Sequence, residues 1–122
     1  MSDKKKILIV DDDPTIVKFL ESILAGKGYE VVKGKDGLEA MTLVKDHKPQ
    51  LIVLDIMMPE INGYDVCRNL KFDSPYKDIP VLLLTSRDQE IDPRIGQMMG
   101  ISYLQKPVNR DAFLAKIEQM LK

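Results

Sequence analysis

Cysteine is almost absent from the sequence, which contains only Cys67. A single cysteine cannot form an internal disulfide, and neither cysteine nor histidine stands near Cys67 at the spacing of metal ligands. These absences exclude a zinc site and favour a reducing compartment, so we expect the protein in the cytoplasm.

Long apolar runs and an excess of basic charge are also missing. No run approaches the roughly 20 residues of a membrane helix, and the apolar residues after Lys6 are too few for a signal peptide. Eighteen basic residues against nineteen acidic ones give a net charge of -1, which argues against nucleic-acid binding by the domain itself. We therefore expect no membrane and no nucleic-acid partner.

The chain has no Gly/Ser-rich or Pro-rich tract of the kind that marks a linker or a disordered segment. Its 122 residues, 44% of them hydrophobic, suit one compact globular domain. We expect residues 1–122 to form a single domain with its core at about residues 6–121.

Short segments rich in Val, Ile and Leu predict five strands, at residues 7–10, 29–32, 51–54, 81–84 and 102–105. Three of them are continuous apolar runs, as in a parallel sheet that helices cover on both faces. Apolar residues at helical spacing follow each strand, although Pro93 and Gly96 weaken the helix expected within 90–99. Five strand-helix repeats with right-handed crossovers predict a three-layer α/β sandwich.

Helix starts carry recognisable N-cap residues. Asp13 precedes Pro14, and Asp36 precedes Glu39 by three positions as in a capping box. Asparagines are predicted N-caps for the third and fifth helices, at Asn62 and Asn109.

Polar residues stand at the ends of four of the predicted strands. The carboxyl ends of parallel strands share one edge of the sheet, where ligands bind at the point where the strand order reverses. The residues at these ends are Asp11, Asp12 and Asp13 after the first strand, Asp55 after the third, Thr85 after the fourth and Lys106 after the fifth.

Clustered carboxylates repel one another by about 4 kcal/mol per pair at ~4 Å in a partly buried site, so a cation must offset the repulsion. Mg²⁺ prefers carboxylates together with water and phosphate oxygens. The ammonium of Lys106 and the hydroxyl of Thr85 suit a phosphoryl group. The sequence therefore predicts a site for Mg²⁺ and a phosphoryl group at this edge.

The sequence lacks a Gly-rich phosphate-binding loop, which disfavours a bound nucleotide. A carboxylate can instead carry the phosphoryl group covalently as an aspartyl-phosphate. Asp55 is the best candidate because it stands alone at its strand end, whereas Asp11 and Asp12 sit together as metal ligands.

Four motifs, in order and at these spacings, resemble the receiver domain of two-component response regulators, of the chemotaxis-regulator-like single-domain type. They are Val10-Asp11-Asp12-Asp13-Pro14, Leu54-Asp55-Ile56-Met57-Met58-Pro59 with Asn62-Gly63, Leu84-Thr85-Ser86-Arg87, and Tyr103-Leu104-Gln105-Lys106-Pro107. The resemblance covers the whole chain. It implies a flavodoxin-like, doubly wound, five-stranded parallel sheet of order 2-1-3-4-5.

The resemblance also implies the roles of the acidic residues. Asp55 resembles the phosphoacceptor, and Asp12 the direct Mg²⁺ ligand, while Asp11 acts largely through water. Asp55 itself and the backbone carbonyl of Met57 complete the protein ligands of the metal in this family.

Further roles follow for residues near the last two strands. Thr85 and Lys106 resemble the phosphoryl-binding residues, and Thr85 and Tyr103 resemble the switch pair. By the same resemblance, the peptide bond between Lys106 and Pro107 is cis.

The implied function is a phosphorylation-dependent signalling switch and not an enzyme that turns over an external substrate. The implied phosphodonor is a phosphohistidine on a sensor histidine kinase or a histidine phosphotransfer protein. The implied output is a downstream protein or an output domain, reached through the face formed by the fourth helix, fifth strand and fifth helix, and a phosphorylation-dependent dimer fits the same type.

Two positions depart from the family pattern. The stretch Gly100-Ile101-Ser102-Tyr103 has Ile in place of Ala and one residue fewer before the aromatic, which shortens the loop before the last strand. Val108 stands where Phe commonly follows the Lys-Pro pair.

Two other functions remain open from the residues. Asp11, Asp13 and Thr15 also fit the Asp-x-Asp-x-Thr signature of Mg²⁺-dependent haloacid-dehalogenase-like phosphatases. That family needs a further acidic pair at another strand end, and it gives Asp55 no role. A flavodoxin-like cofactor binder would carry a phosphate-binding Ser/Thr/Gly loop after the first strand, where this chain has aspartates.

Overall fold

The computed structural model describes residues 4–55, 63–71, 75–85 and 101–121. Along these residues the chain forms β1 (Lys6–Val10), α1 (Pro14–Ala25), β2 (Glu30–Gly34), α2 (Gly37–His47), β3 (Leu51–Asp55), α3 (Gly63–Lys71), β4 (Val81–Thr85), β5 (Ile101–Gln105) and α5 (Arg110–Met120). The helix expected within 90–99 and the predicted cap Asn62 lie outside the described residues.

The five strands form one sheet in the order β2-β1-β3-β4-β5, and every neighbouring pair is parallel. The strand order reverses between β1 and β3, since the chain adds β2 on one side of β1 and the later strands on the other. The predicted flavodoxin-like, doubly wound sheet is confirmed. By the rule for open α/β sheets, the binding site lies where β1 and β3 end.

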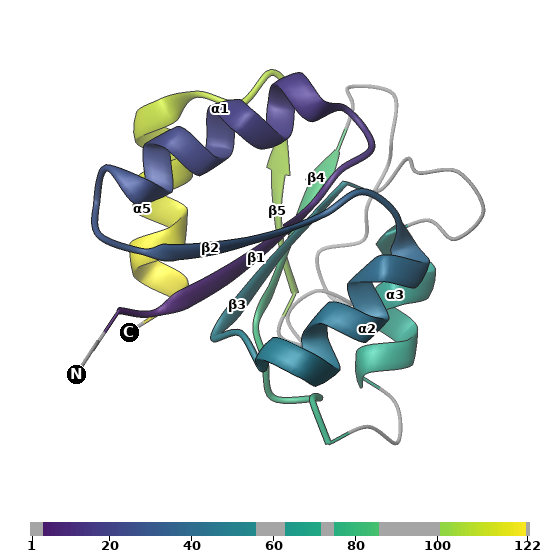
Figure 1. Cartoon of the computed structure of the whole chain (residues 1–122). Coiled ribbons are helices and arrows are strands. Elements are labelled where there is room, and N and C mark those ends of the chain that lie inside the picture. The colour runs from purple at the N-terminus through teal and green to yellow at the C-terminus, as the bar shows by residue number, and fades with distance from the viewer. Residues whose placement is uncertain (1–3, 56–62, 72–74, 86–100, 122) are drawn as a thin grey trace.

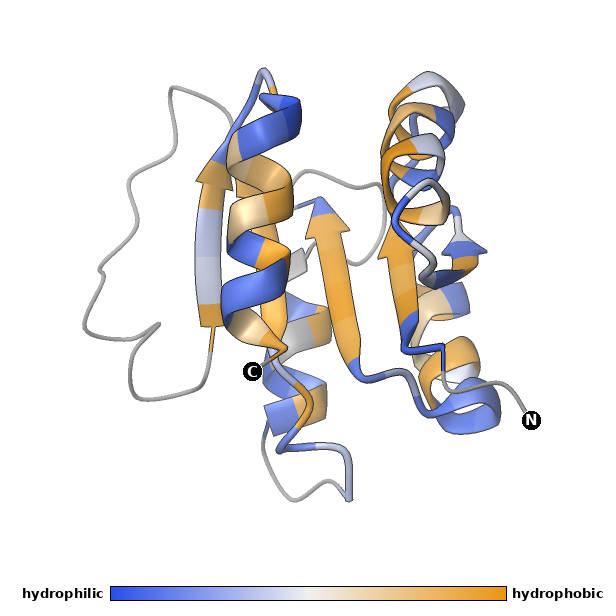
Figure 2. Ribbon diagram, turned by 90° about the vertical axis from the view of Figure 1, so that its left-hand side faces the viewer, coloured by the Kyte–Doolittle hydropathy of each residue, from blue (hydrophilic) through white to orange (hydrophobic). Residues whose placement is uncertain are grey.

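Helices cover both faces of the sheet, with α1 and α5 on one face and α2 and α3 on the other (Figure 1). Side chains alternate between the faces along each strand. In β1, Ile7 and Ile9 pack under α1 and α5, whereas Leu8 and Val10 pack under α2 and α3. The apolar strands therefore form two cores, one on each face, and Figure 2 shows these hydrophobic strands between the helices.

The central strands β3 and β4 are buried at every position. Their last residues are polar, so the buried ladder itself carries Asp55 and Thr85 to the edge of the sheet. Both residues were expected just after the strands, and the observed strands include them.

The edge strand β2 differs more from its prediction, because it begins at Glu30 and continues to Gly34. The parallel register pairs Lys33 with Ile9 and Gly34 with Val10, so pairing with β1 extends the strand past its apolar part. An edge strand has one exposed side, which makes its sequence signal weaker than that of a central strand.

Three of the predicted N-caps are confirmed by hydrogen bonds. The side chain of Asp13 accepts a hydrogen bond from the backbone N–H of Thr15 (2.9 Å). In the same way Asp36 accepts from the N–H of Glu39 (2.8 Å), and Asn109 accepts from the N–H of Ala112 (3.0 Å). These bonds satisfy donors that a helix start otherwise leaves without an intrahelical partner. No helix in the described part of the chain is both long and apolar enough to span a membrane.

Replacement of the α2 cap tests this account of the helix starts. Asp36→Ala should lower the free energy of unfolding by about 1 kcal/mol, because the Glu39 N–H loses its acceptor. Urea unfolding followed by circular dichroism measures the change. Asp46→Ala, in the exposed last turn of the same helix, is the matched control and should leave stability unchanged or slightly higher. Equal losses in both variants would contradict the capping role.

Candidate functional site

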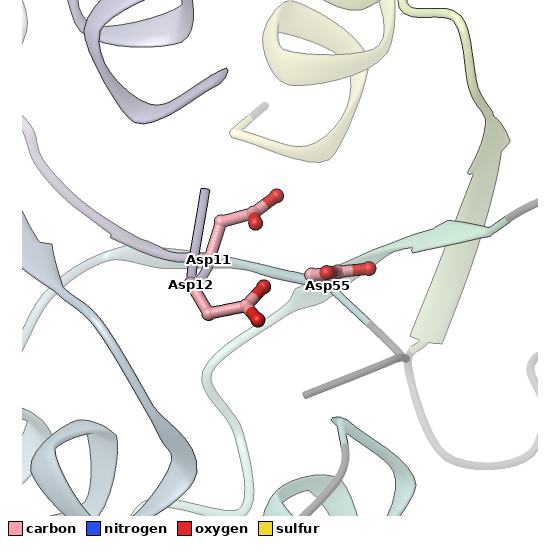
Figure 3. A group of neighbouring side chains, drawn as sticks. All are labelled: Asp11, Asp12 and Asp55. Carbon is pink, nitrogen blue, oxygen red and sulfur yellow. The ribbon is translucent and has the colours of Figure 1, made fainter. Parts of the chain in front are cut away.

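Three carboxylates meet at the carboxyl edge of the sheet, where β1 and β3 end (Figure 3). Each of Asp11, Asp12 and Asp55 offers a carboxylate oxygen, and these oxygens lie within 4.8 Å of one another. Asp11 and Asp55 are 2% and 5% exposed, whereas Asp12 is exposed. The cluster therefore combines two buried charges with one that faces solvent.

Asp11 is held on both its backbone and its side chain. Its N–H donates to the carbonyl of Gly34 (3.2 Å), which continues the contact between β1 and β2 one step beyond the strands. Its Oδ1 accepts from the backbone N–H of Asp13 (2.9 Å). The carboxylate of Asp13 in turn caps α1 at Thr15. Asp13 thus starts the helix and is not part of the carboxylate cluster.

Lys106 bridges the two buried carboxylates. Its Nζ lies 3.3 Å from Oδ2 of Asp11 and 3.2 Å from Oδ1 of Asp55. The backbone N–H of Lys106 donates to the carbonyl of Thr85 (2.7 Å), and the peptide bond from Lys106 to Pro107 is cis. One ammonium therefore offsets the repulsion between two carboxylates that come from different strands.

The charges in this cluster shift one another's titration. Burial raises the pKa of Asp11 above its usual value of 3.8, and the charge of Asp55 adds to the rise; the hydrogen bond from Asp13 and the nearby Lys106 oppose it without cancelling it. For Lys106, burial lowers the pKa, but the carboxylates of Asp11 and Asp55 more than compensate, so its pKa lies above its usual value. Lys106 is therefore firmly protonated, while the ionised form of Asp11 is disfavoured.

Thr85 and Tyr103 lie on one face of the sheet, on adjacent strands. Leu83 pairs with Tyr103 and Thr85 pairs with Gln105, so Thr85 and Tyr103 are diagonal neighbours on the α2 and α3 side. Thr85 is 5% exposed. Tyr103 is partly buried against the core of that face, and its hydroxyl oxygen is buried. A movement at Thr85 thus has a short path to the aromatic ring.

The donor set fits a hard divalent cation. All three side chains offer oxygen, and the exposed position of Asp12 leaves room for water ligands, both of which suit Mg²⁺. The raised pKa of Asp11 agrees with this fit, because a site that disfavours a carboxylate's charge is stabilised by added positive charge. The expected fourth ligand, the carbonyl of Met57, lies outside the described residues.

One feature of this edge had no signal in the motifs. A pocket of about 590 Å³ adjoins the cluster between the start of α1 and the end of β2, and Asp11 and Asp12 line it together with Lys18, Lys33 and Lys35. The lysines that flank Gly34 at the end of the edge strand were the available hint. Only the pairing of β2 with β1 shows that these lysines lie at the edge of the sheet that carries the carboxylate cluster.

The response regulator receiver domain family matches residues 7–118. The chain belongs to this family. Among similar proteins, the probable transcriptional regulator ycf27 of Cyanophora paradoxa is 41% identical over 98% of this chain and 49% of its own length. Protein PilH of Pseudomonas aeruginosa is 38% identical over 95% of this chain and 97% of its own length. The crystal structure of a putative response regulator from Chloroflexus aurantiacus J-10-fl matches with a TM-score of 0.87 at 32% identity and covers 98% of each chain.

The receiver described here spans about half the length of several curated relatives that it matches. Receiver domains are phosphoacceptor signalling modules and not turnover enzymes, so the phosphatase hypothesis is rejected. The use of Asp13 as a helix cap agrees with this result, because the phosphatase signature needs that carboxylate in the site.

The raised pKa of Asp11 predicts that the charged site costs the metal-free receiver stability. Asp11→Asn should raise the free energy of unfolding at neutral pH, because Asn keeps an oxygen acceptor for the Asp13 N–H and carries no charge. Urea unfolding in the presence of a chelator measures the difference.

The direction of the Asp11 pKa shift determines how the stability difference between Asp11→Asn and the wild type changes with pH. The folded-state pKa of Asp11 lies above the unfolded value, so the cost appears as the pH rises from 3.8 through the folded pKa and is complete above it. The advantage of Asp11→Asn should accordingly shrink on acidification. A variant no more stable than the wild type at neutral pH would show that Lys106 already offsets the whole cost.

Proposed function

We propose that the receiver accepts a phosphoryl group on Asp55, in a Mg²⁺-dependent reaction, and changes its output face in response. The observation that carries this proposal is the position of Asp55. It is buried at the end of a central strand, 3.2 Å from the ammonium of Lys106 and within 4.8 Å of the carboxylates of Asp11 and Asp12. A nucleophilic carboxylate thus stands beside both a fixed positive charge and a set of metal ligands.

The phosphodonor is a phosphohistidine on a sensor histidine kinase or a histidine phosphotransfer protein. A carboxylate oxygen of Asp55 attacks phosphorus, the P–N bond breaks, and its electron pair leaves with the imidazole. Lys106 holds the attacking carboxylate beforehand and then donates to the transferred phosphoryl oxygens, since its ammonium has three donors. The hydroxyl of Thr85, at the end of the neighbouring strand, donates to another of these oxygens.

Asp11, Asp12 and Asp55, together with the carbonyl of Met57 that the family resemblance adds, would hold the Mg²⁺ ion. When bound, Mg²⁺ supplies positive charge that offsets the repulsion between the phosphoryl oxygens and the carboxylates. The chain contributes the arrangement: β1 and β3 bring the acidic residues together, and Lys106 keeps two of them in place.

Thr85 and Tyr103 couple the site to the output face. When the Thr85 hydroxyl moves toward the phosphoryl group, it vacates space on the sheet face that it shares with Tyr103, and the packing of the partly buried ring changes in response. The output face comprises the helix expected within 90–99, β5 and α5. It acts on a downstream protein or an output domain, and a phosphorylation-dependent dimer can use the same face.

Residues 1–122 work as one receiver domain with a core of about 6–121, which agrees with the family match over 7–118. The two buried cores span this range, from Ile7 to Ile117. The receiver domain itself does not bind nucleic acid under this proposal. In a longer protein that binds nucleic acid, another domain makes those contacts.

Labelling tests the phosphoacceptor. Incubation with Mg²⁺ and a small phosphodonor such as phosphoramidate should add one phosphoryl group, found by peptide mass spectrometry on the segment that contains Asp55. Asp55→Asn should abolish the label, because the amide is not a comparable nucleophile. Asp46→Asn is the matched control and should be labelled normally. Persistent label on the same peptide of Asp55→Asn would contradict the assignment.

The switch is tested at Thr85 with the phosphoryl mimic beryllofluoride. We expect the mimic to slow amide exchange in β5 around Tyr103, and we expect Thr85→Val to lose this response while Thr85→Ser keeps it, because only Ser retains the hydroxyl. Hydrogen exchange with mass spectrometry makes the measurement, and exchange in α2 is the internal reference. An unchanged β5 response in Thr85→Val would exclude the coupling through this hydroxyl.

A further inference from the structure

The pocket beside the carboxylate cluster is lined by both apolar and charged residues. It measures about 590 Å³, within the range of small-molecule sites, and it opens between α1 and the end of β2. Pro14 and Val17 supply apolar surface on the α1 side. Asp11 and Asp12 line it as well, and their carboxylate oxygens lie within 4.8 Å of a carboxylate oxygen of Asp55, so the pocket adjoins the carboxylate cluster.

The lysines around this pocket differ in their partners. Lys33 forms an ion pair with Glu21, with Nζ and Oε2 3.1 Å apart. Lys18 and Lys35 are exposed, and among the described residues neither forms an ion pair or a side-chain hydrogen bond. Glu39 is the remaining acidic residue of the wall.

The charge of the pocket therefore depends on the metal. Once a divalent cation joins the cluster, the cation and the Lys106 ammonium together balance its three carboxylates. The ion pair between Lys33 and Glu21 is neutral. Lys18 and Lys35 against Glu39 then leave one net positive charge beside apolar surface. Such a pocket suits an organic anion with an apolar body.

We propose that this pocket is a subsite for small phosphodonors, selecting acyl phosphates whose organic part carries a second anionic group. Lys18 and Lys35 are its specificity-determining residues. The inference rests on the proposed function of Asp55. Acyl phosphates are the fitting class for two reasons. Transfer from an acyl phosphate to Asp55 exchanges one acyl phosphate bond for another of similar energy, whereas a phosphate ester would have to gain energy. The leaving group is a carboxylate that needs no proton, whereas the amine that leaves a phosphoramidate takes one up.

The transfer balances without any further reactant. A carboxylate oxygen of Asp55 forms a bond to phosphorus, and the bond between phosphorus and the acyl oxygen breaks. The electron pair stays with the acyl oxygen, so the leaving group departs as a carboxylate and needs no proton. Lys18 and Lys35 attract the distal anion of the donor and take no part in the bond changes.

A matched pair of donors isolates the distal anion. Benzoyl phosphate and 4-carboxybenzoyl phosphate have the same ring and leaving group and differ in one carboxylate. Rates of Asp55 phosphorylation are measured with both donors at fixed free Mg²⁺ and subsaturating donor, by mass spectrometry. The quantity of interest is the rate ratio of the carboxylated donor to the plain donor.

We expect Lys18→Met and Lys35→Met each to lower this ratio about two- to fivefold, the size of an exposed ion pair. Glu39→Gln should raise the ratio, because it removes the opposing charge and an amide still serves the third position of a helix start. Added salt should lower the ratio in the wild type. Lys45→Met removes the same charge from an exposed site of α2 outside the pocket, and it should leave the ratio unchanged.

The outcomes separate the two proposals. If phosphoramidate and both acyl phosphates fail to label Asp55, the proposed function itself is wrong. If all three label Asp55 and the ratio in Lys18→Met, Lys35→Met and Glu39→Gln equals that of the wild type, only the subsite is overturned. An equal drop in Lys45→Met would likewise overturn it, since the effect would then reflect net charge and not the pocket.

Discussion

The site depends on the repulsion between two carboxylates that the sheet buries side by side. Asp11 follows β1 and Asp55 ends β3, and these strands are neighbours, so the fold cannot form without bringing the two together. Lys106 is the only described cation in contact with both. The last strand of the sheet must therefore be in place before the charges of the first and third are compensated, which links completion of the fold to the integrity of the site.

The sequence predicts the strands well where helices bury both faces of the sheet. β3 and β4 read as continuous apolar runs because helices cover both of their faces, and the observed strands begin where predicted and end one residue later. β2 was misplaced by up to two residues at its end, because at an edge the ladder with β1 decides where the strand stops and no apolar residue marks that point. Side-chain caps were predictable for a local reason: Asp36 acts on a backbone N–H three positions away.

The candidate site was predictable as a set of residues but not as a set of contacts. Strand ends identify Asp11, Asp55, Thr85 and Lys106, since parallel strands place them on one edge. Neither the bridging position of Lys106 nor the helix-capping role of Asp13 follows from spacing, because both depend on side-chain direction. The lysine-lined pocket was harder still to predict from the sequence, since its lining residues come from four elements: the ends of β1 and β2 and the helices α1 and α2.

The same electrostatic arrangement explains how a small chemical event can move a large surface. In the metal-free receiver Lys106 is shared between two carboxylates, and the site disfavours the ionised form of Asp11. In the proposed function, a phosphoryl group on Asp55 would convert one of those partners into a larger anion, so Lys106 and the Thr85 hydroxyl would gain a contact that exists in only one state. A ligand shifts a conformational equilibrium only by such a difference in interaction. Because Thr85 shares its sheet face with Tyr103, the proposed difference would act on β5, which is part of the proposed output face.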